Sequence, residues 1–188
     1  MSAWNNGEYS LLKGFAKDAC DTDNFKNNLE NNCEILHFHQ GPSKKGGIST
    51  INAPGCKAHR FVWDNRTFIE DTVKLHLKLD RPVKIFYSGS LITSGGGIPM
   101  HSDWYPENIS KDPDAVVARA ILTINPEYVF GTDVFWDRDD NSRTECLGGY
   151  PGDLLIFKCS PISFHSVGMR TEEHADRYSI NMMFRYIN

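Results

Sequence analysis

The second half of the chain contains two motifs whose residue types bind metal ions. His101 and Asp103 are one residue apart, and residues with this spacing on a strand point to the same face. His165 comes later, after a Pro-Gly turn and an apolar stretch at 150–157. Alone, a His-x-Asp pair is common by chance, and a single strand histidine more often has a structural hydrogen-bonding role. Together the three residues could occupy one face of an octahedral metal ion and leave its other positions open.

Arg177 and Ser179 form a third feature with chemical potential. They share one face if residues 176–187 form a strand. A guanidinium group pairs with a carboxylate through a planar fork, and a serine hydroxyl adds a further donor. The alternative is a surface salt bridge, which contributes little to stability.

In their order and spacing, these features resemble the Fe(II)/2-oxoglutarate-dependent oxygenase superfamily. Its pattern is His-x-Asp, then a distant His, then an Arg that often belongs to Arg-x-Ser. The stretch Pro151-Gly152 followed by apolar residues also resembles the family strand before the second His. Thr132 stands where the family has the second glycine of Gly-Gly-x-Leu. The similarity covers residues 82–187.

The resemblance implies a mainly β fold, the double-stranded β-helix, which is a jelly-roll, cupin-like barrel. It implies that His101, Asp103 and His165 bind Fe(II) and act as the catalytic centre. The co-substrate 2-oxoglutarate would chelate the iron and reach Arg177 and Ser179. Dioxygen would be the oxidant, succinate a product, and ascorbate a stimulant. Halogenases of the superfamily lack the carboxylate ligand, so Asp103 favours hydroxylation; desaturation and cyclisation stay open.

The primary substrate is less constrained by the sequence. We expect a small molecule such as an amino acid or a related metabolite, because no accessory domain is available to hold a macromolecule. The alternative is a peptidyl hydroxylase of the prolyl type. A nucleic-acid dealkylase and a non-catalytic cupin-like binder are less favoured. A dealkylase places its second Arg six residues after the first, whereas Arg185 follows Arg177 by eight.

Several further residues are candidates for contact with the ligands. Tyr87 lies on the stretch before the His-x-Asp motif, where family members often place a tyrosine against the co-substrate. Candidates for the substrate side are Trp104, Tyr105, Arg119, Trp136 and Arg185. Each also has a structural interpretation as a packing residue or a salt-bridge partner.

The elements that must position these residues are short strands. From Arg81 onward, apolar runs alternate with Gly, Pro, Asp and Asn, which is typical of a β-sandwich or barrel. The predicted strands are 82–92, 97–102, 116–125, 129–136, 142–147, 153–158, 162–167 and 176–187.

The first part of the chain predicts helices that buttress this barrel. Residues 8–31 carry apolar residues at helical spacing, including Leu11 and Leu12. Residues 35–39 predict a strand and 40–56 a loop. A helix is expected over 65–79, capped by Asp64. We therefore expect one domain, 1–188, with a helical buttress and first strand in 1–80 and the barrel in 81–188.

The bulk composition favours an ordinary intracellular enzyme. The net charge is −4 and basic residues are scattered, which argues against nucleic acid as a partner. Five cysteines without a Cys-x-x-Cys motif predict free thiols in a reducing compartment. No signal peptide or membrane span is visible, so we expect cytoplasmic residence and no membrane partner. The oligomeric state stays open.

Overall fold

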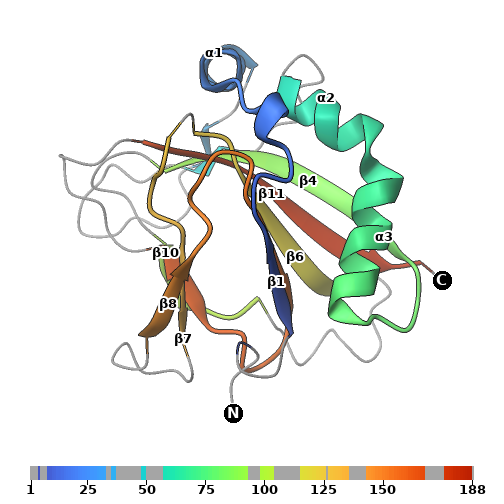
Figure 1. Cartoon of the computed structure of the whole chain (residues 1–188). Helices are drawn as coiled ribbons and strands as arrows, with labels where there is room; N and C mark the ends of the chain where they lie inside the picture. Colours follow the sequence, from blue (N-terminus) through green and yellow to red (C-terminus); the bar gives the residue numbers. More distant parts are fainter. Residues whose placement is uncertain are drawn as a thin grey trace.

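Two antiparallel sheets face each other and form an open-ended barrel, with helices against one outer face (Figure 1). The computed structural model describes residue 4 and the ranges 8–32, 35–36, 48–49, 57–92, 98–103, 115–125, 127–135, 143–167 and 176–187. Most of the predicted 40–56 loop and residues 37–39 of the expected strand lie outside these ranges.

The larger sheet has five strands in the order β1-β9-β6-β11-β4. Their bounds are β1 Tyr9–Leu12, β9 Leu154–Lys158, β6 Val116–Thr123, β11 Arg177–Tyr186 and β4 Val83–Ile92. The smaller sheet has four strands in the order β5-β10-β7-β8. Its strands are β5 Ile98–His101, β10 His165–Val167, β7 Thr132–Phe135 and β8 Arg143–Leu147. A separate pair is formed by β2 Ile35–Leu36 and β3 Ile48–Ser49.

The chain passes back and forth between the two large sheets. β6 leads to β7, and β8, β9, β10 and β11 then alternate between the smaller and the larger sheet. This alternation, with all neighbouring strands antiparallel, is the double-stranded β-helix expected from the sequence. The eight predicted strands of 82–187 are confirmed, with bounds that differ by a few residues at most.

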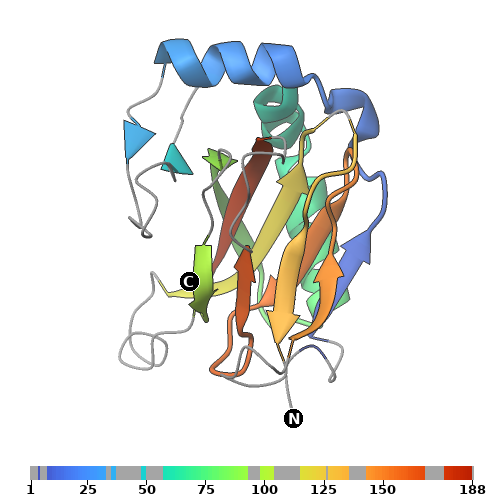
Figure 2. The same ribbon diagram turned by 90° about the vertical axis from the view of Figure 1, so that its left-hand side faces the viewer.

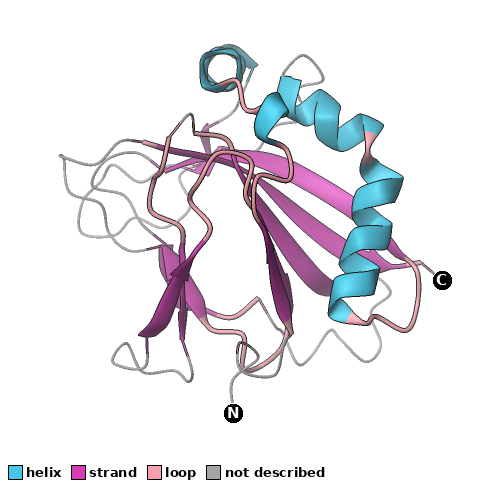
Figure 3. Cartoon of the chain, in the orientation of Figure 1, coloured by secondary structure: helices cyan, strands magenta, loops and turns pink. Residues whose placement is uncertain are grey.

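The helices lie on the outer side of the larger sheet and at one end of the barrel (Figure 3). They are α1 Thr22–Asn32, α2 Lys57–Asp64 and α3 Arg66–Leu77, preceded by the 3-10 turn η1 Lys17–Ala19. In the turned view, α1 lies across one end of the two sheets (Figure 2). Its Phe25 packs edge-on against Tyr178 of β11, with ring centroids 6.2 Å apart. None of the helices in the described ranges combines the length and apolar character of a membrane-crossing segment.

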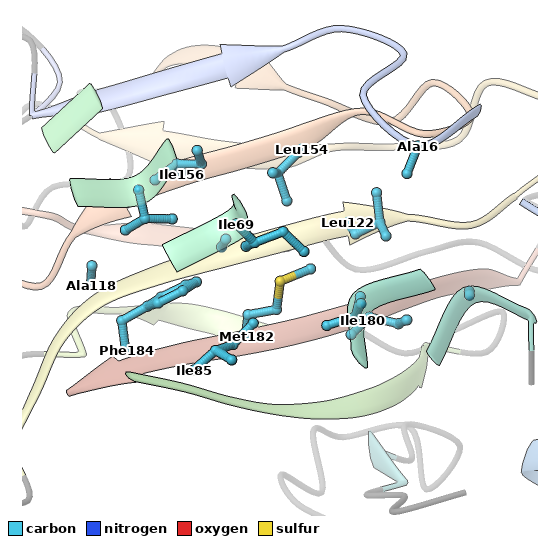
Figure 4. Packing of buried hydrophobic residues seen from close by; sticks show 14 of the residues in the cluster. Ala16, Ile69, Ile85, Ala118, Leu122, Leu154, Ile156, Ile180, Met182 and Phe184 are labelled. Carbon is cyan, nitrogen blue, oxygen red and sulfur yellow. The ribbon is translucent and has the colours of Figure 1, made fainter. Parts of the chain in front are cut away.

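The main core lies between α3 and the larger sheet (Figure 4). Successive strand residues point to opposite faces, so every second residue of the central strands meets the helices. Fully buried examples are Ala118, Ala120, Leu122, Ile180, Met182 and Phe184, which pack with Ile69. Burial of each large apolar side chain contributes about 1.5–3 kcal/mol. This face gives the sheet a rigid back, and the opposite face is available to line the barrel.

The Pro-Gly turn before β9 depends on its glycine. Gly152 has a φ of +74°, and a Cβ at this position would lie 2.3 Å from the Lys17 nitrogen. The Gly152 N–H donates to the Thr123 carbonyl, and its own carbonyl accepts from Ala16. The turn therefore fixes β9 beside β6 and the N-terminal segment.

Two expectations for the N-terminal part were wrong. Residues 9–12 form the edge strand β1, which pairs with β9, instead of a helix. A helix precedes Asp64, which is the last residue of α2, so Asp64 does not cap α3. Asn65 separates the two helices, and its amide donates to the Phe61 carbonyl of α2. Along α3, Ile69 and Val73 are buried, whereas Phe68 and Leu75 are exposed.

Candidate metal centre

His101, Asp103 and His165 converge inside the barrel. His101 ends β5 and His165 begins β10, and the two residues oppose each other in the antiparallel register. Their ring centroids are 4.4 Å apart. One potential ligand atom from each of the three side chains lies within 4.8 Å of the other two. The sequence predicted that these residues would meet, and the fold brings them together.

The separations suit ligands of a single metal ion. Asp103 Oδ1 is 3.6 Å from His101 Nε2, and Asp103 Oδ2 is 3.4 Å from His165 Nε2. Adjacent ligands that each bind one ion at about 2.1 Å are roughly 3 Å from each other. A metal ion therefore fits the donor set, and two imidazoles with one carboxylate are the donors that Fe(II) oxygenases use.

The ring of His165 is oriented by its own strand. Its Nδ1 lies 2.9 Å from the Ser163 carbonyl, which can only accept a hydrogen bond. This contact keeps a proton on Nδ1, so Nε2, which faces Asp103, is the nitrogen that would bind a metal. The next carbonyl, that of Phe164, accepts from the Trp4 indole at 3.0 Å. The Phe157 ring packs on the imidazole with centroids 4.8 Å apart.

Asp103 is held as a carboxylate. Burial alone would raise its pKa, but hydrogen bonds from His101 and His165 and the positive charge of Arg119 together hold the pKa far below its usual range. The Arg119 Nε lies 2.9 Å from Asp103 Oδ2. The ionised carboxylate is the form of Asp103 that can bind a divalent cation.

Arg177 and Ser179 lie deep in the same barrel, and each is only 2% exposed. Arg177 Nη2 donates to the Thr132 hydroxyl at 3.3 Å, across to the smaller sheet. Asn125 anchors the backbone on both sides of Arg177: its amide donates to the Asp176 carbonyl, and its carbonyl oxygen accepts from the Tyr178 N–H. A buried guanidinium and hydroxyl on one strand face offer the donors that a carboxylate needs.

The other predicted site residues have mixed outcomes. Arg119 contacts the candidate ligand Asp103, as described above. Arg185 lies on the same face of β11 as Arg177, with its guanidinium 4.8 Å from the Phe86 ring centroid. Trp104, Tyr105 and Trp136 lie outside the described residues.

The strand register does not support the predicted contact of Tyr87 with the co-substrate. Its backbone opposes Met182 on β11. Met182 belongs to the helix-facing core, on the opposite face from Arg177 and Ser179. The side chain of Tyr87 itself is not among the described parts, so its contact with a co-substrate stays a prediction.

Sequence reasoning missed several residues that support the site. Thr132 was noticed only as a departure from a Gly-Gly motif, yet its hydroxyl contacts Arg177. Trp4 stands alone in a polar stretch without any motif, yet it is buried against Phe157. Asn125 ends the predicted strand 116–125, and its two backbone hydrogen bonds give it a structural role. Only Thr132 had a signal in the sequence, because a polar residue replaced a glycine there.

Comparisons with known proteins relate this fold to solved structures. No protein-family model and no curated protein sequence matches the chain. A Pseudomonas putida prolyl-4-hydroxylase structure is similar with a TM-score of 0.71 and 14% identity, over 98% of this chain and 95% of that chain. A Trichoplax adhaerens prolyl hydroxylase, solved with a peptide of hypoxia inducible factor, gives a TM-score of 0.70 and 13% identity over 97% and 85%.

An enzyme of a different kind is similar to the same extent. The non-haem alpha-ketoglutarate-dependent epimerase SnoN from nogalamycin biosynthesis has a TM-score of 0.69 and 12% identity, over 98% of this chain and 78% of that chain. At such identities the likeness establishes the fold, which is the double-stranded β-helix of the 2-oxoglutarate oxygenases.

Proposed function

We propose that this chain is a non-haem Fe(II)- and 2-oxoglutarate-dependent dioxygenase, an oxidoreductase that couples substrate oxidation to decarboxylation of 2-oxoglutarate to succinate. The observation that carries the proposal is the convergence of His101, Asp103 and His165 in a barrel of this fold. The buried pair Arg177 and Ser179 supports the choice of co-substrate.

In the proposed mechanism, His101, Asp103 and His165 would hold the iron, which supplies the redox chemistry of dioxygen activation. Arg177 would bind the distal carboxylate of 2-oxoglutarate, and Ser179 would donate a further hydrogen bond to it. Thr132 keeps the guanidinium in place through its hydroxyl. Because charge-assisted bonds are stronger away from water, the burial of this end favours tight and oriented binding of the co-substrate.

Apolar side chains would keep the reaction away from bulk water. Trp4, Val134, Leu155 and Phe157 form a cluster between the two sheets. Phe157 packs directly on the His165 ring. Exclusion of water strengthens the electrostatic contacts of the site and limits side reactions of the oxidant.

For the primary substrate, we propose a small molecule such as an amino acid or related metabolite, with hydroxylation as the outcome. Asp103 supports hydroxylation because it fills the position that a halide would need. A peptidyl hydroxylase of the prolyl type is the second candidate. It is favoured by one specific observation, namely that prolyl hydroxylases are among the most similar solved structures.

The test is succinate formation by the full chain with Fe(II), ascorbate and 2-oxoglutarate. Free amino acids form one panel of substrates and proline-containing peptides form the other. We expect iron-dependent succinate formation that one panel stimulates, and no activity in Asp103→Ala. Equal turnover in Asp103→Ala, or no iron-dependent turnover under any condition, would contradict the proposed function.

Labelled dioxygen then tests the reaction outcome. A hydroxylase product should carry one oxygen atom derived from dioxygen, with one succinate formed for each product molecule. An unlabelled product that has lost a pair of hydrogen atoms would instead indicate desaturation or cyclisation.

A further inference from the structure

Arg119 contacts the carboxylate of the candidate metal ligand Asp103 from the larger sheet. Its Nε lies 2.9 Å from Asp103 Oδ2, and the two side chains are 28% and 8% exposed. The contact has the distance of an ion pair, although the N–H direction does not meet the angle of a hydrogen bond. Because both groups are partly shielded from water, their attraction is stronger than that of an exposed pair.

The Arg119 side chain is held in this place by its neighbours. On β6, Arg119 opposes Phe157 of β9 and Met183 of β11, so it lies in the middle of the sheet. The buried Cys159 thiol lies beside the same guanidinium. Arg119 therefore bridges a buried thiol and the Asp103 carboxylate, and its position is fixed by the larger sheet independently of β5 and β10.

The contact distinguishes the two oxygens of Asp103. A carboxylate can bind a metal ion through one oxygen or through both. The guanidinium contacts Oδ2, which also lies 3.4 Å from His165 Nε2, whereas Oδ1 lies 3.6 Å from His101 Nε2. A cation beside Oδ2 disfavours a second metal bond from that oxygen, because its positive charge repels the metal ion.

The number of open metal positions depends on this choice. Three protein donors leave three positions on an octahedral ion. A chelating co-substrate takes two of them, and dioxygen needs the third. If Asp103 used both oxygens, one of these positions would be lost.

We propose that Arg119 is a positioning residue that keeps Asp103 a ligand through one oxygen, by holding Oδ2 in an ion pair. The inference deepens the proposed function and rests on it for the role of the three ligands. It assigns Arg119 a role at the metal and not, as the sequence first indicated, at the substrate.

The first experiment uses Co²⁺ alone as the probe, with the full chain. Arg119→Met removes the charge and keeps much of the length, and Arg119→Lys keeps a charge without the planar fork. Arg60→Met is the matched control, because Arg60 is an exposed residue of α2, which packs against the outer face of the sheet. The visible Co²⁺ spectrum reports coordination number and geometry, and a titration gives the affinity.

We expect Arg119→Met to change the Co²⁺ spectrum and to weaken Co²⁺ binding about 10- to 100-fold, the usual effect of losing a partner that orients a ligand. Arg119→Lys should lie between Arg119→Met and the parent, and Arg60→Met should match the parent. Parent-like spectrum and affinity in Arg119→Met would overturn the inference. If Arg119→Met does not fold, as judged by circular dichroism, the same comparison is made with Arg119→Gln and Arg119→Lys.

The second experiment measures 2-oxoglutarate binding to the Co²⁺-loaded proteins. Arg119→Met leaves Arg177 intact. If Arg119 only stabilised the fold, the Kd of 2-oxoglutarate for the folded, Co²⁺-loaded variant would equal that of the parent. If the variant instead loses an open position on the metal ion, the Kd of 2-oxoglutarate should be at least about tenfold higher than for the parent. An unchanged Kd would contradict the inference.

The two experiments also separate this inference from the proposed function. If the parent protein does not bind Co²⁺, or if Asp103→Ala binds it equally well, the proposed metal centre itself is wrong. If Asp103→Ala loses Co²⁺ while Arg119→Met behaves as the parent, only the role of Arg119 is wrong.

Discussion

His101 and His165 oppose each other across two neighbouring antiparallel strands, with ring centroids 4.4 Å apart. The pairing of β5 with β10 thus sets the distance between two candidate metal ligands through backbone hydrogen bonds. Asp103 follows two residues after the end of that pairing and completes the set. The sheet register therefore positions the two imidazoles relative to each other.

Removal of a ligand should abolish metal binding without unfolding the barrel. We expect His165→Ala and Asp103→Ala to lower Co²⁺ or Fe²⁺ affinity by at least about 100-fold, because each removes one of three protein donors. Calorimetric titration measures the affinity and circular dichroism the fold. His76→Ala is the control, because His76 lies on α3 and bonds to Ser10 outside the barrel. Metal binding that survives in both ligand variants would refute the assignment.

Replacement of Arg177 should weaken binding of 2-oxoglutarate and leave metal binding unchanged. Loss of a charge-assisted contact in a buried site costs roughly 2–5 kcal/mol, so Arg177→Met should raise the Kd of 2-oxoglutarate at least about 30-fold. Thr132→Val, which removes one hydrogen-bond partner of Arg177, should cost about 1 kcal/mol. Arg81→Met, at an exposed site over Tyr186, is the control. An unchanged Kd in Arg177→Met places the carboxylate contact elsewhere.

Trp4 should contribute strongly to stability although it lies outside any motif. The side chain is 6% exposed and packs on Phe157 and Tyr9, with centroids 5.4 Å and 5.5 Å away. We expect Trp4→Ala to lower the free energy of unfolding by about 3–5 kcal/mol. Trp63→Ala, at a site that is 58% exposed, should change it by less than about 1 kcal/mol. Urea denaturation gives both values, and equal effects would mean that Trp4 is not part of the core.

Two cysteines should resist alkylation in the native protein. Burial raises the pKa of Cys20 to about 11, and burial also raises the pKa of Cys159. The thiolate is the nucleophile, so both should label slowly with iodoacetamide at pH 8, and Cys20 faster as the pH approaches 11. Mass spectrometry of pulsed samples measures this, with urea-unfolded protein as the control. Fast native labelling of both at pH 8 would contradict their burial.

The same shifts have a consequence for stability at high pH. The folded pKa of Cys20 lies above the ordinary value of 9.0, so its contribution to stability is complete below pH 9 and is lost as the pH rises toward 11. Cys20→Ala should flatten this loss in denaturation experiments carried out across that pH range.

The barrel strands could be predicted because each carries its own signal. Short apolar runs bounded by turn residues located β4 to β11. The His-x-Asp spacing identified two candidate ligands that do meet, although β5 ends at His101 and Asp103 lies just beyond the strand. The edge strand β1 could not be recognised, because Leu11 and Leu12 are adjacent and fit a helical stripe as well as a strand. Only the pairing with β9, a tertiary interaction, decides between the two.

The contacts that support the site could not be predicted from the sequence, for a related reason. Arg119 meets Asp103, Thr132 meets Arg177 and Trp4 meets Phe164, and each pair joins different strands or segments. Local spacing carries no information about such pairs, because they depend on how the two sheets close over each other.

The place of β11 in the larger sheet also matters during synthesis of the chain. β11 lies between β6 and β4, both of which precede it in the sequence. Until β11 has left the ribosome, β4 and β6 each have a long hydrogen-bonding edge without its eventual neighbour. Open edges of this kind are templates for wrong strand pairing between chains. Insertion of the strand that carries Arg177 is therefore both the step that closes these edges and the step that completes the candidate site.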